Sequence, residues 1–81
     1  MKIQVHFYAQ LRDLAGAQTV DVDLPENAAV SDLLEMLYSQ IPALRSQDKN
    51  ILVGAGLEFV ERNYKLKSDE DVSIMPPVQG G

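Results

Sequence analysis

The 81-residue sequence contains no cysteine and a single histidine, His6. Without cysteine the chain can form no disulfide, no thiolate nucleophile and no thiolate metal site. No apolar run approaches the roughly 20 residues needed to cross a bilayer. Residues 1–8 enter an alternating pattern at once, which is not the pattern of a signal peptide. We therefore expect a cytoplasmic protein that does not act on a membrane.

Basic residues are also scarce, with 7 Lys and Arg against 12 Asp and Glu, which gives a net charge of -5. Such a surface would be repelled by nucleic-acid phosphates and is better matched to a partner with a basic groove. The hydrophobic content of 46% is that of a folded globular chain. A chain of this length buries only about 60–65% of its unfolded surface, which leaves room for one core and one domain.

The end of the chain carries its least ordinary feature. The last six residues are Pro76, Pro77, Val78, Gln79, Gly80 and Gly81. A terminal α-carboxylate has a pKa of about 3.5, so it is ionised at neutral pH and can attack a nucleotide phosphate. Glycine lacks a Cβ and can enter a narrow slot, whereas the two prolines favour an extended exit from the domain. The pattern predicts a stiff stem with a small reactive tip.

The first quarter of the chain has the period-two alternation of half-buried strands. Apolar and polar residues alternate over residues 2–8 and again over residues 19–24, and the connection contains Gly16. This predicts an antiparallel hairpin. Leu11 and Leu14 lie three residues apart in the connection, which indicates a helical turn packed against the core.

A helix is predicted over residues 30–41, where apolar residues recur at intervals of three and four. These residues are Val30, Leu33, Leu34, Leu37, Tyr38 and Ile41. Pro42 should end the helix. Ser31 and Asp32 suit the first turn, but Ala29 is a poor N-cap and would cost on the order of 1 kcal/mol.

The rest of the chain reads as short strands: residues 51–53, a turn at 54–56, a strand or edge segment at 57–60, and a final strand at 72–75. Leu66 should anchor the connection before the last strand. The element order predicts an α+β fold of the β-grasp type, with a mixed sheet wrapped around one main helix. We assign residues 1–76 to this domain and residues 77–81 to a flexible C-terminal tail.

Three residues are candidates for a partner interface. Tyr8 and Met75 are out of phase with the core residues of their strands, so both should face outward. In a β-grasp the first and last strands are parallel neighbours, which would bring these residues together near the tail. Phe59 could extend the patch. Scattered exposed apolar residues are also ordinary, so both readings remain open.

Other candidate sites are weaker. His6 could act as a general base, but no residue completes a nucleophilic unit with it, and a solvated histidine is the simpler reading. The acidic residues 69–71 lack the spacing of a calcium loop and suit a turn. Gly54 and Gly56 do not precede a helix, so a hairpin turn is favoured over a phosphate cradle.

Three segments together resemble the molybdopterin synthase small subunit, the MoaD family of ubiquitin-like sulfur carriers. They are residues 5–16 (VHFYAQLRDLAG), residues 30–34 (VSDLL) and residues 71–81 (DVSIMPPVQGG). The resemblance covers the whole chain, and its most specific part is Pro-Pro-Val before the terminal diglycine. Gly56 and Asp69 depart from the residues that the family often carries there, but both tolerate a left-handed turn.

The resemblance implies a non-catalytic sulfur-donor subunit of a sulfurtransferase complex. An adenylyltransferase of the ubiquitin-activating type would use Mg-ATP to adenylate Gly81, and sulfur from a sulfurtransferase would replace AMP to give a thiocarboxylate. The large synthase subunit would pass this sulfur to a cyclic pyranopterin, building the dithiolene that binds molybdenum. The chain itself would hold no cofactor or metal.

The resemblance also implies a heterotetramer of two small and two large subunits, with Tyr8, Phe59 and Met75 at the contact. The alternatives are a carrier for thiamine, cysteine or tungsten-cofactor synthesis, a ubiquitin-like modifier joined to lysines of target proteins, and a β-grasp interaction module with an incidental tail.

Overall fold

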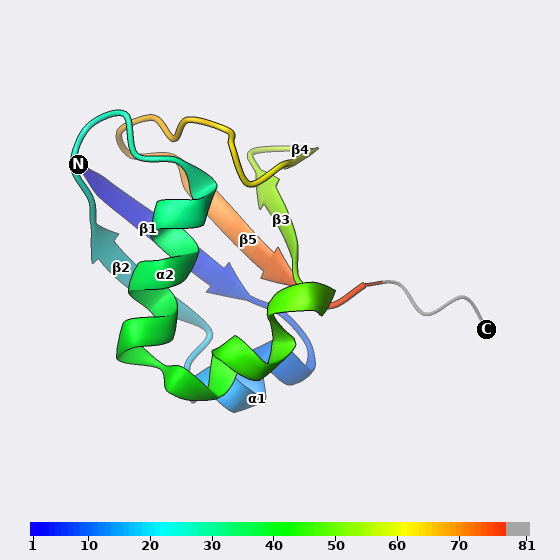
Figure 1. Cartoon of the computed structure of the whole chain (residues 1–81). Helices are drawn as coiled ribbons and strands as arrows, with labels where there is room; N and C mark the ends of the chain where they lie inside the picture. Colours follow the sequence, from blue (N-terminus) through cyan, green and yellow to red (C-terminus); the bar gives the residue numbers. More distant parts are fainter. Residues whose placement is uncertain (78–81) are drawn as a thin grey trace.

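The structure of the protein is a computed structural model that describes residues 1–77. Its elements are β1 (Lys2–Phe7), α1 (Gln10–Ala15), β2 (Thr19–Asp23), α2 (Val30–Gln40), the 3₁₀ segment η1 (Pro42–Asn50), β3 (Leu52–Ala55), β4 (Glu58–Val60) and β5 (Asp71–Met75). One mixed sheet lies against α2 (Figure 1). This is the α+β arrangement that the element order predicted.

The strands are ordered β2-β1-β5-β3-β4 across the sheet. β1 and β2 form the predicted antiparallel hairpin, in which Val5 pairs with Val20. β1 and β5 pair in parallel, with Phe7 opposite Ile74, and β3 runs antiparallel to both of its neighbours. The first and last strands therefore lie side by side at the centre of the sheet, as expected of a β-grasp.

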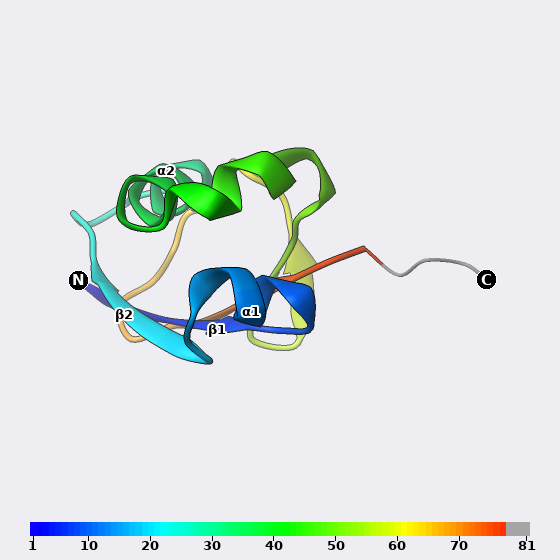
Figure 2. The same ribbon diagram turned by 90° about the horizontal axis from the view of Figure 1, so that it is seen from below.

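The core lies between the sheet and α2, and the alternation of the strands determines which side chains enter it. Figure 2 shows α2 and η1 on one side of the sheet. The fully buried side chains of the sheet include Ile3, Val5, Val72 and Ile74. The buried side chains of α2 are Val30, Leu33, Leu34, Leu37 and Tyr38, the stripe that the three-and-four spacing predicted.

The start of α2 does not carry the expected penalty for alanine at the N-cap. Ala29 is the N-cap and has no capping side chain. The first free amides of the helix donate instead to carbonyl groups of the loop between β4 and β5. Val30 N–H donates to Tyr64 O and Ser31 N–H to Arg62 O, both at 2.9 Å. Because these amides are satisfied by tertiary contacts, a side-chain cap is not required.

The ends of α2 agree with the sequence in other respects. The Asp32 carboxylate accepts a hydrogen bond from the Ala29 amide at 2.8 Å, which is half of a capping box. The helix ends at Gln40, two residues before Pro42. Proline disfavours helical backbone in the residue before it, so this end is the predicted one.

Several local expectations were wrong. Leu11 is buried as expected, but Leu14 is 39% exposed and does not pack into the core. Gly54 lies within β3 and not in a turn, and Ile51 precedes the strand. The turn falls at Gly56, which has a φ of 63°.

The connection from β4 to β5 behaves as predicted. Leu66 is buried, and its amide donates to Ala28 O at 2.8 Å, which anchors the connection beneath the start of α2. Asp69 has a φ of 65°, the left-handed conformation that its turn was expected to tolerate.

Candidate functional site: the outer face of the sheet

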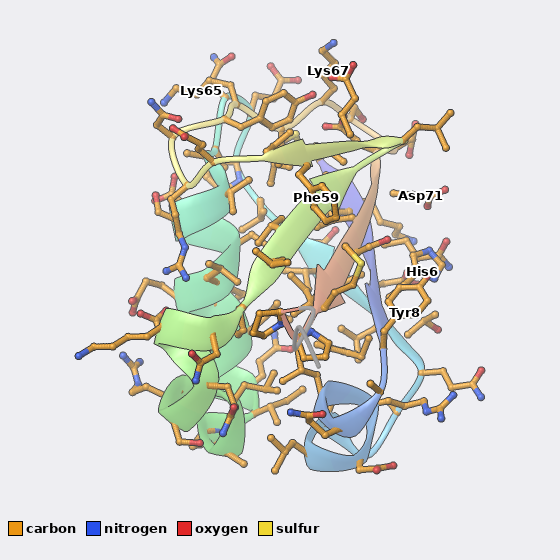
Figure 3. The ribbon with its side chains drawn as sticks, turned by 90° about the vertical axis from the view of Figure 1, so that its right-hand side faces the viewer. His6, Tyr8, Phe59, Lys65, Lys67 and Asp71 are labelled. Carbon is orange, nitrogen blue, oxygen red and sulfur yellow. The ribbon has the colours of Figure 1, made fainter. Side chains whose placement is uncertain are left out.

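The face of the sheet opposite α2, called the outer face from here on, is not covered by any helix among residues 1–77 (Figure 2). Tyr8 follows directly after β1, and its amide donates to Ile74 O at 3.1 Å. This bond holds Tyr8 beside the end of β5. Figure 3 shows Tyr8, together with His6 and Asp71, on the side of the sheet away from α2. The Tyr8 residue is 48% exposed.

The structure brings Tyr8 and Met75 together, as their strand phase predicted, and Phe59 extends the group. Met75 is the last residue of β5, and Phe59 stands in β4 opposite Gly54 of β3. All three line one open hollow of about 280 Å³. Phe59 is 70% exposed, so a large part of its ring faces solvent. Exposed aromatic and apolar groups gathered in this way are typical of interaction surfaces.

Leu57 is a further member of this group that the sequence analysis missed. It lies at the tip of the β3–β4 hairpin, is fully exposed and lines the same hollow. Its position directly after Gly56 was a usable signal, because a turn leaves an apolar residue no core to enter. We call Tyr8, Leu57, Phe59 and Met75 the apolar patch.

The tail begins beside the apolar patch. Pro76 and Pro77 follow Met75 directly and are partly exposed. Figure 1 shows the chain leaving the sheet at the end of β5. The predicted tip, made of Val78, Gln79, Gly80 and Gly81, lies outside the described residues. Its role therefore stays a prediction.

The other half of the outer face, over β1 and β2, is polar. His6 Nε2 lies 3.6 Å from Asp71 Oδ1, an ion pair only when the imidazole is protonated. The His6 side chain is 30% exposed, so it is partly solvated. Among residues 1–77 no group of three or more His, Asp or Glu side chains is arranged to hold a metal ion.

The acidic turn before β5 has a structural role, as its composition predicted. The Glu70 carboxylate accepts hydrogen bonds from Tyr64 Oη at 2.8 Å and from the Lys67 amide at 2.9 Å. The bond to Glu70 raises the pKa of the Tyr64 hydroxyl above its usual value. The turn is thus closed by its own side chain, which fixes where β5 begins.

A second polar cluster, on the helical side, was not predicted. Tyr38 Oη donates to Asp48 Oδ1 at 2.6 Å, and Arg62 Nη1 donates to the same oxygen at 2.9 Å. Burial, followed by the bond to Asp48, raises the pKa of Tyr38. The bonds from Tyr38 and Arg62 lower the pKa of the Asp48 carboxyl. These contacts join α2, η1 and the loop between β4 and β5.

Comparison with known proteins identifies the family. A family model described as the ThiS family matches residues 5–81. The chain belongs to the ThiS family. This ThiS-family chain is 34% identical over 83 aligned residues to the molybdopterin synthase sulfur carrier subunit of Chlamydomonas reinhardtii, and the alignment covers 100% of both chains. The resemblance found in the sequence is confirmed.

Solved structures similar to this ThiS-family chain confirm the ubiquitin-like β-grasp fold. SAMP1 from Haloferax volcanii superposes with a TM-score of 0.90 at 29% identity and covers 100% of both chains. One chain of a complex of subunits 1 and 2 of the molybdopterin-converting factor from Helicobacter pylori superposes with a TM-score of 0.73 at 17% identity, again over 100% of both chains. The second likeness concerns the fold alone. No helix in the described part of the chain is both long and apolar enough to span a membrane.

Proposed function

We propose that the chain is the sulfur carrier subunit of a molybdopterin synthase and carries sulfur as a thiocarboxylate on Gly81. The observation that carries the proposal is the position of the apolar patch at the root of a tail that ends in diglycine. A full-length relative named as a molybdopterin synthase sulfur carrier subunit supports it. A sulfur carrier needs a surface that binds its partner and a narrow tail whose end can enter the partner's active site.

The chemistry takes place on the terminal carboxylate, which is a poor electrophile until it is activated. A ubiquitin-activating-type adenylyltransferase would join the Gly81 carboxylate oxygen to the α-phosphorus of Mg-ATP with loss of pyrophosphate. Hydrosulfide, released from the persulfide of a sulfurtransferase by a thiol reductant, would then attack the acyl carbon, displace AMP and leave the thiocarboxylate. The Mg-ATP belongs to the activating enzyme, and this chain holds no cofactor of its own.

The chain supplies the sulfur, and its partner supplies the charge that binds the substrate. A cyclic pyranopterin carries phosphate, which cationic groups would have to hold. This chain has a net charge of -5 and gathers no basic cluster near the apolar patch. The cationic residues would therefore belong to the large subunit.

The proposed partner is the large synthase subunit, with two small and two large subunits in the assembly. The neighbour from Helicobacter pylori, itself named as a complex of two subunits, supports a partner of this kind. The apolar patch would form the buried centre of the contact, because aromatic and apolar residues concentrate at interface cores. The complex would act in the cytoplasm.

A second candidate is a protein modifier, favoured by the likeness to SAMP1, which is named a small archaeal modifier protein. The two functions differ in the fate of the tail. A carrier delivers its sulfur and returns as a free carboxylate, whereas a modifier ends in an isopeptide bond. Carriers for thiamine, cysteine or tungsten-cofactor synthesis would share the first fate and differ in the substrate.

The first experiment tests activation. The purified chain is incubated with the activating enzyme, Mg-ATP and a sulfur source, and mass spectrometry of the C-terminal peptide should show one oxygen replaced by sulfur at Gly81. The matched control lacks Gly81 and should fold normally but gain no sulfur. Sulfur on another residue, or on the truncated chain, would contradict the proposal.

The second experiment separates carrier from modifier. The thiocarboxylated chain is mixed with the large subunit and the pyranopterin precursor, and the expected products are molybdopterin and unmodified chain. Gly80→Ala should slow the transfer because its methyl obstructs the passage of the tail, whereas His6→Ala should leave the rate unchanged. Lysine-linked adducts as the main product would support the modifier instead.

A further inference from the structure

Gly54 forms the floor of the hollow that the apolar patch surrounds. It stands in β3 opposite Phe59 of β4 and Ser73 of β5. Both positive-φ glycines in the described part of the chain are elsewhere, at Gly16 and Gly56. The backbone at Gly54 is therefore one that any residue can adopt, and a glycine inside a strand is unfavourable relative to alanine. The fold itself does not call for glycine here.

Neighbouring atoms do not require glycine at this position either. A Cβ built on Gly54 would lie 3.4 Å from Met75 Cε, 3.5 Å from Glu58 O and 3.8 Å from Ser73 Cβ. These are ordinary van der Waals distances, and the nearest atom is the mobile end of a methionine. A methyl group would thus fit the free chain. Its effect would be to raise the floor of the hollow.

The hollow has the size and chemistry of a socket for a side chain. Its volume is about 280 Å³, and a closed apolar cavity of about 150 Å³ is already large enough to bind benzene. Its walls include the four members of the apolar patch, and its polar side-chain groups are the Tyr8 hydroxyl and those of Glu58 and Ser73. One large aliphatic or aromatic side chain matches this space.

The position of the tail determines which protein lies over the hollow. Residues 76–81 span at most about 20 Å when fully extended, and they start from Met75, which lines the hollow. A protein that encloses the Gly81 carboxylate must therefore bind it within about 20 Å of Met75, which leaves the apolar patch within reach of its surface. We propose that the hollow over Gly54 receives one apolar side chain of the large synthase subunit, and that the missing side chain of Gly54 sets the depth of this socket.

This inference rests on the proposed function, and Gly54→Ala tests it. Binding to the large subunit is measured by isothermal titration calorimetry, and the Tm of each free chain is measured beside it. The added methyl should weaken binding between roughly fivefold and a hundredfold, the effect of overfilling a well-packed contact. The Tm of the variant should equal or exceed that of the wild type. Gln4→Leu replaces a polar side chain with an apolar one on the same face on β1, outside the hollow, and should bind within about threefold of the wild type.

Each other outcome would overturn a defined part of the inference. If wild type binds and Gly54→Ala binds equally well, no side chain enters the hollow. A lower Tm for Gly54→Ala would show that the fold itself needs glycine here, so that the missing side chain would not be explained by binding to a partner. If Gln4→Leu weakens binding as much as Gly54→Ala, the effect is not specific to the hollow. If the wild-type chain does not bind the large subunit at all, the proposed function fails, and the socket fails with it.

Discussion

The two faces of the sheet use the same strands and both carry apolar residues, but they differ in what covers those residues. On the inner face Ile3, Val5 and Ile74 are fully buried by α2 and its neighbours. On the outer face Tyr8 and Phe59 remain largely exposed at the root of the tail. Apolar character alone therefore does not show what a residue packs against. The inner face stabilises the domain, and the outer face is available to another protein.

The sharpest test of this comparison introduces a glutamate at either of two adjacent residues, Ile74 on the inner face and Met75 on the outer face. Ile74→Glu would bury an unpaired carboxylate in the core, at a cost of several kcal/mol. That cost is comparable with the whole stability of a small domain, about 5–15 kcal/mol. We expect a chain without a cooperative unfolding transition in circular dichroism. A variant with a near-normal Tm would show that the inner face is not the core.

Met75→Glu is the matched change on the outer face. The free chain should fold with a Tm within a few degrees of the wild type, because Met75 is only partly buried, on the face that no helix covers, and substitutions outside the core change stability by only about 0.5 kcal/mol. Binding to the large subunit should fall by at least about a hundredfold, since the carboxylate would be buried in an apolar contact. Tyr8→Glu should behave in the same way. Equal losses of stability and binding would place both residues in the core.

A smaller effect, and one that raises stability, is expected at Ala9 in the connection between β1 and α1. Ala9 follows Tyr8 with a φ of 54° and a ψ of -136°, and it leads the chain into α1. A backbone of this kind costs a residue with a Cβ about 1–3 kcal/mol. Ala9→Gly should raise the free energy of unfolding by about 1 kcal/mol after the entropy of the unfolded glycine is subtracted. Urea unfolding would show a higher midpoint at an unchanged slope, and a lower midpoint would contradict the assignment of strain.

The smallest expected effect on stability is at Asp48, on the side of the sheet that α2 covers. Asp48 accepts hydrogen bonds from Tyr38 and Arg62, and these bonds lower its pKa. Its contribution to stability is therefore complete above the unfolded pKa, about 3.9, and is lost as the pH falls through the folded pKa. Asp48→Asn should lower the Tm by about 1–5 °C at pH 7, as partly exposed pairs contribute about 0.2–1 kcal/mol.

The pH dependence is the check on that prediction. The Tm difference between Asp48→Asn and wild type should shrink as the pH falls below the unfolded pKa, about 3.9, and through the lower pKa of the folded state. Binding of the large subunit should be unchanged, because Asp48 does not line the hollow that the apolar patch surrounds. A Tm difference that is constant down to pH 2 would show that the charge of Asp48 is not responsible.

Regular alternation allowed much of the fold to be predicted from sequence. The period-two pattern of β1, β2 and β5 and the apolar stripe of α2 are local signals, and the structure confirms each element. The 3₁₀ segment η1 could not be predicted in this way, because Leu44 is its single buried residue and no apolar spacing repeats along it. The location of Gly54 in a strand was also missed, because glycine in a sequence favours the prediction of a turn when its neighbours in space are unknown.

The candidate site, like the fold, could be predicted from the sequence only in part. Tyr8 and Met75 could be placed on the outer face from their phase alone, and the parallel pairing of β1 with β5 then brought them together. The hollow could not be foreseen, since it depends on the register that sets Gly54 between Phe59 and Ser73. The cluster at Asp48 joins residues 10 and 14 apart in the sequence, with no repeating pattern to reveal it.

The central position of β5 has a mechanical consequence. The strand that carries the tail is bonded on both edges, in parallel to β1 and antiparallel to β3. A pull on the tail along the strand axis loads both ladders in shear, so their hydrogen bonds resist together. A pull across an edge strand such as β4 would break its bonds one after another. A partner can therefore draw the tail taut into a deep slot without peeling the domain open.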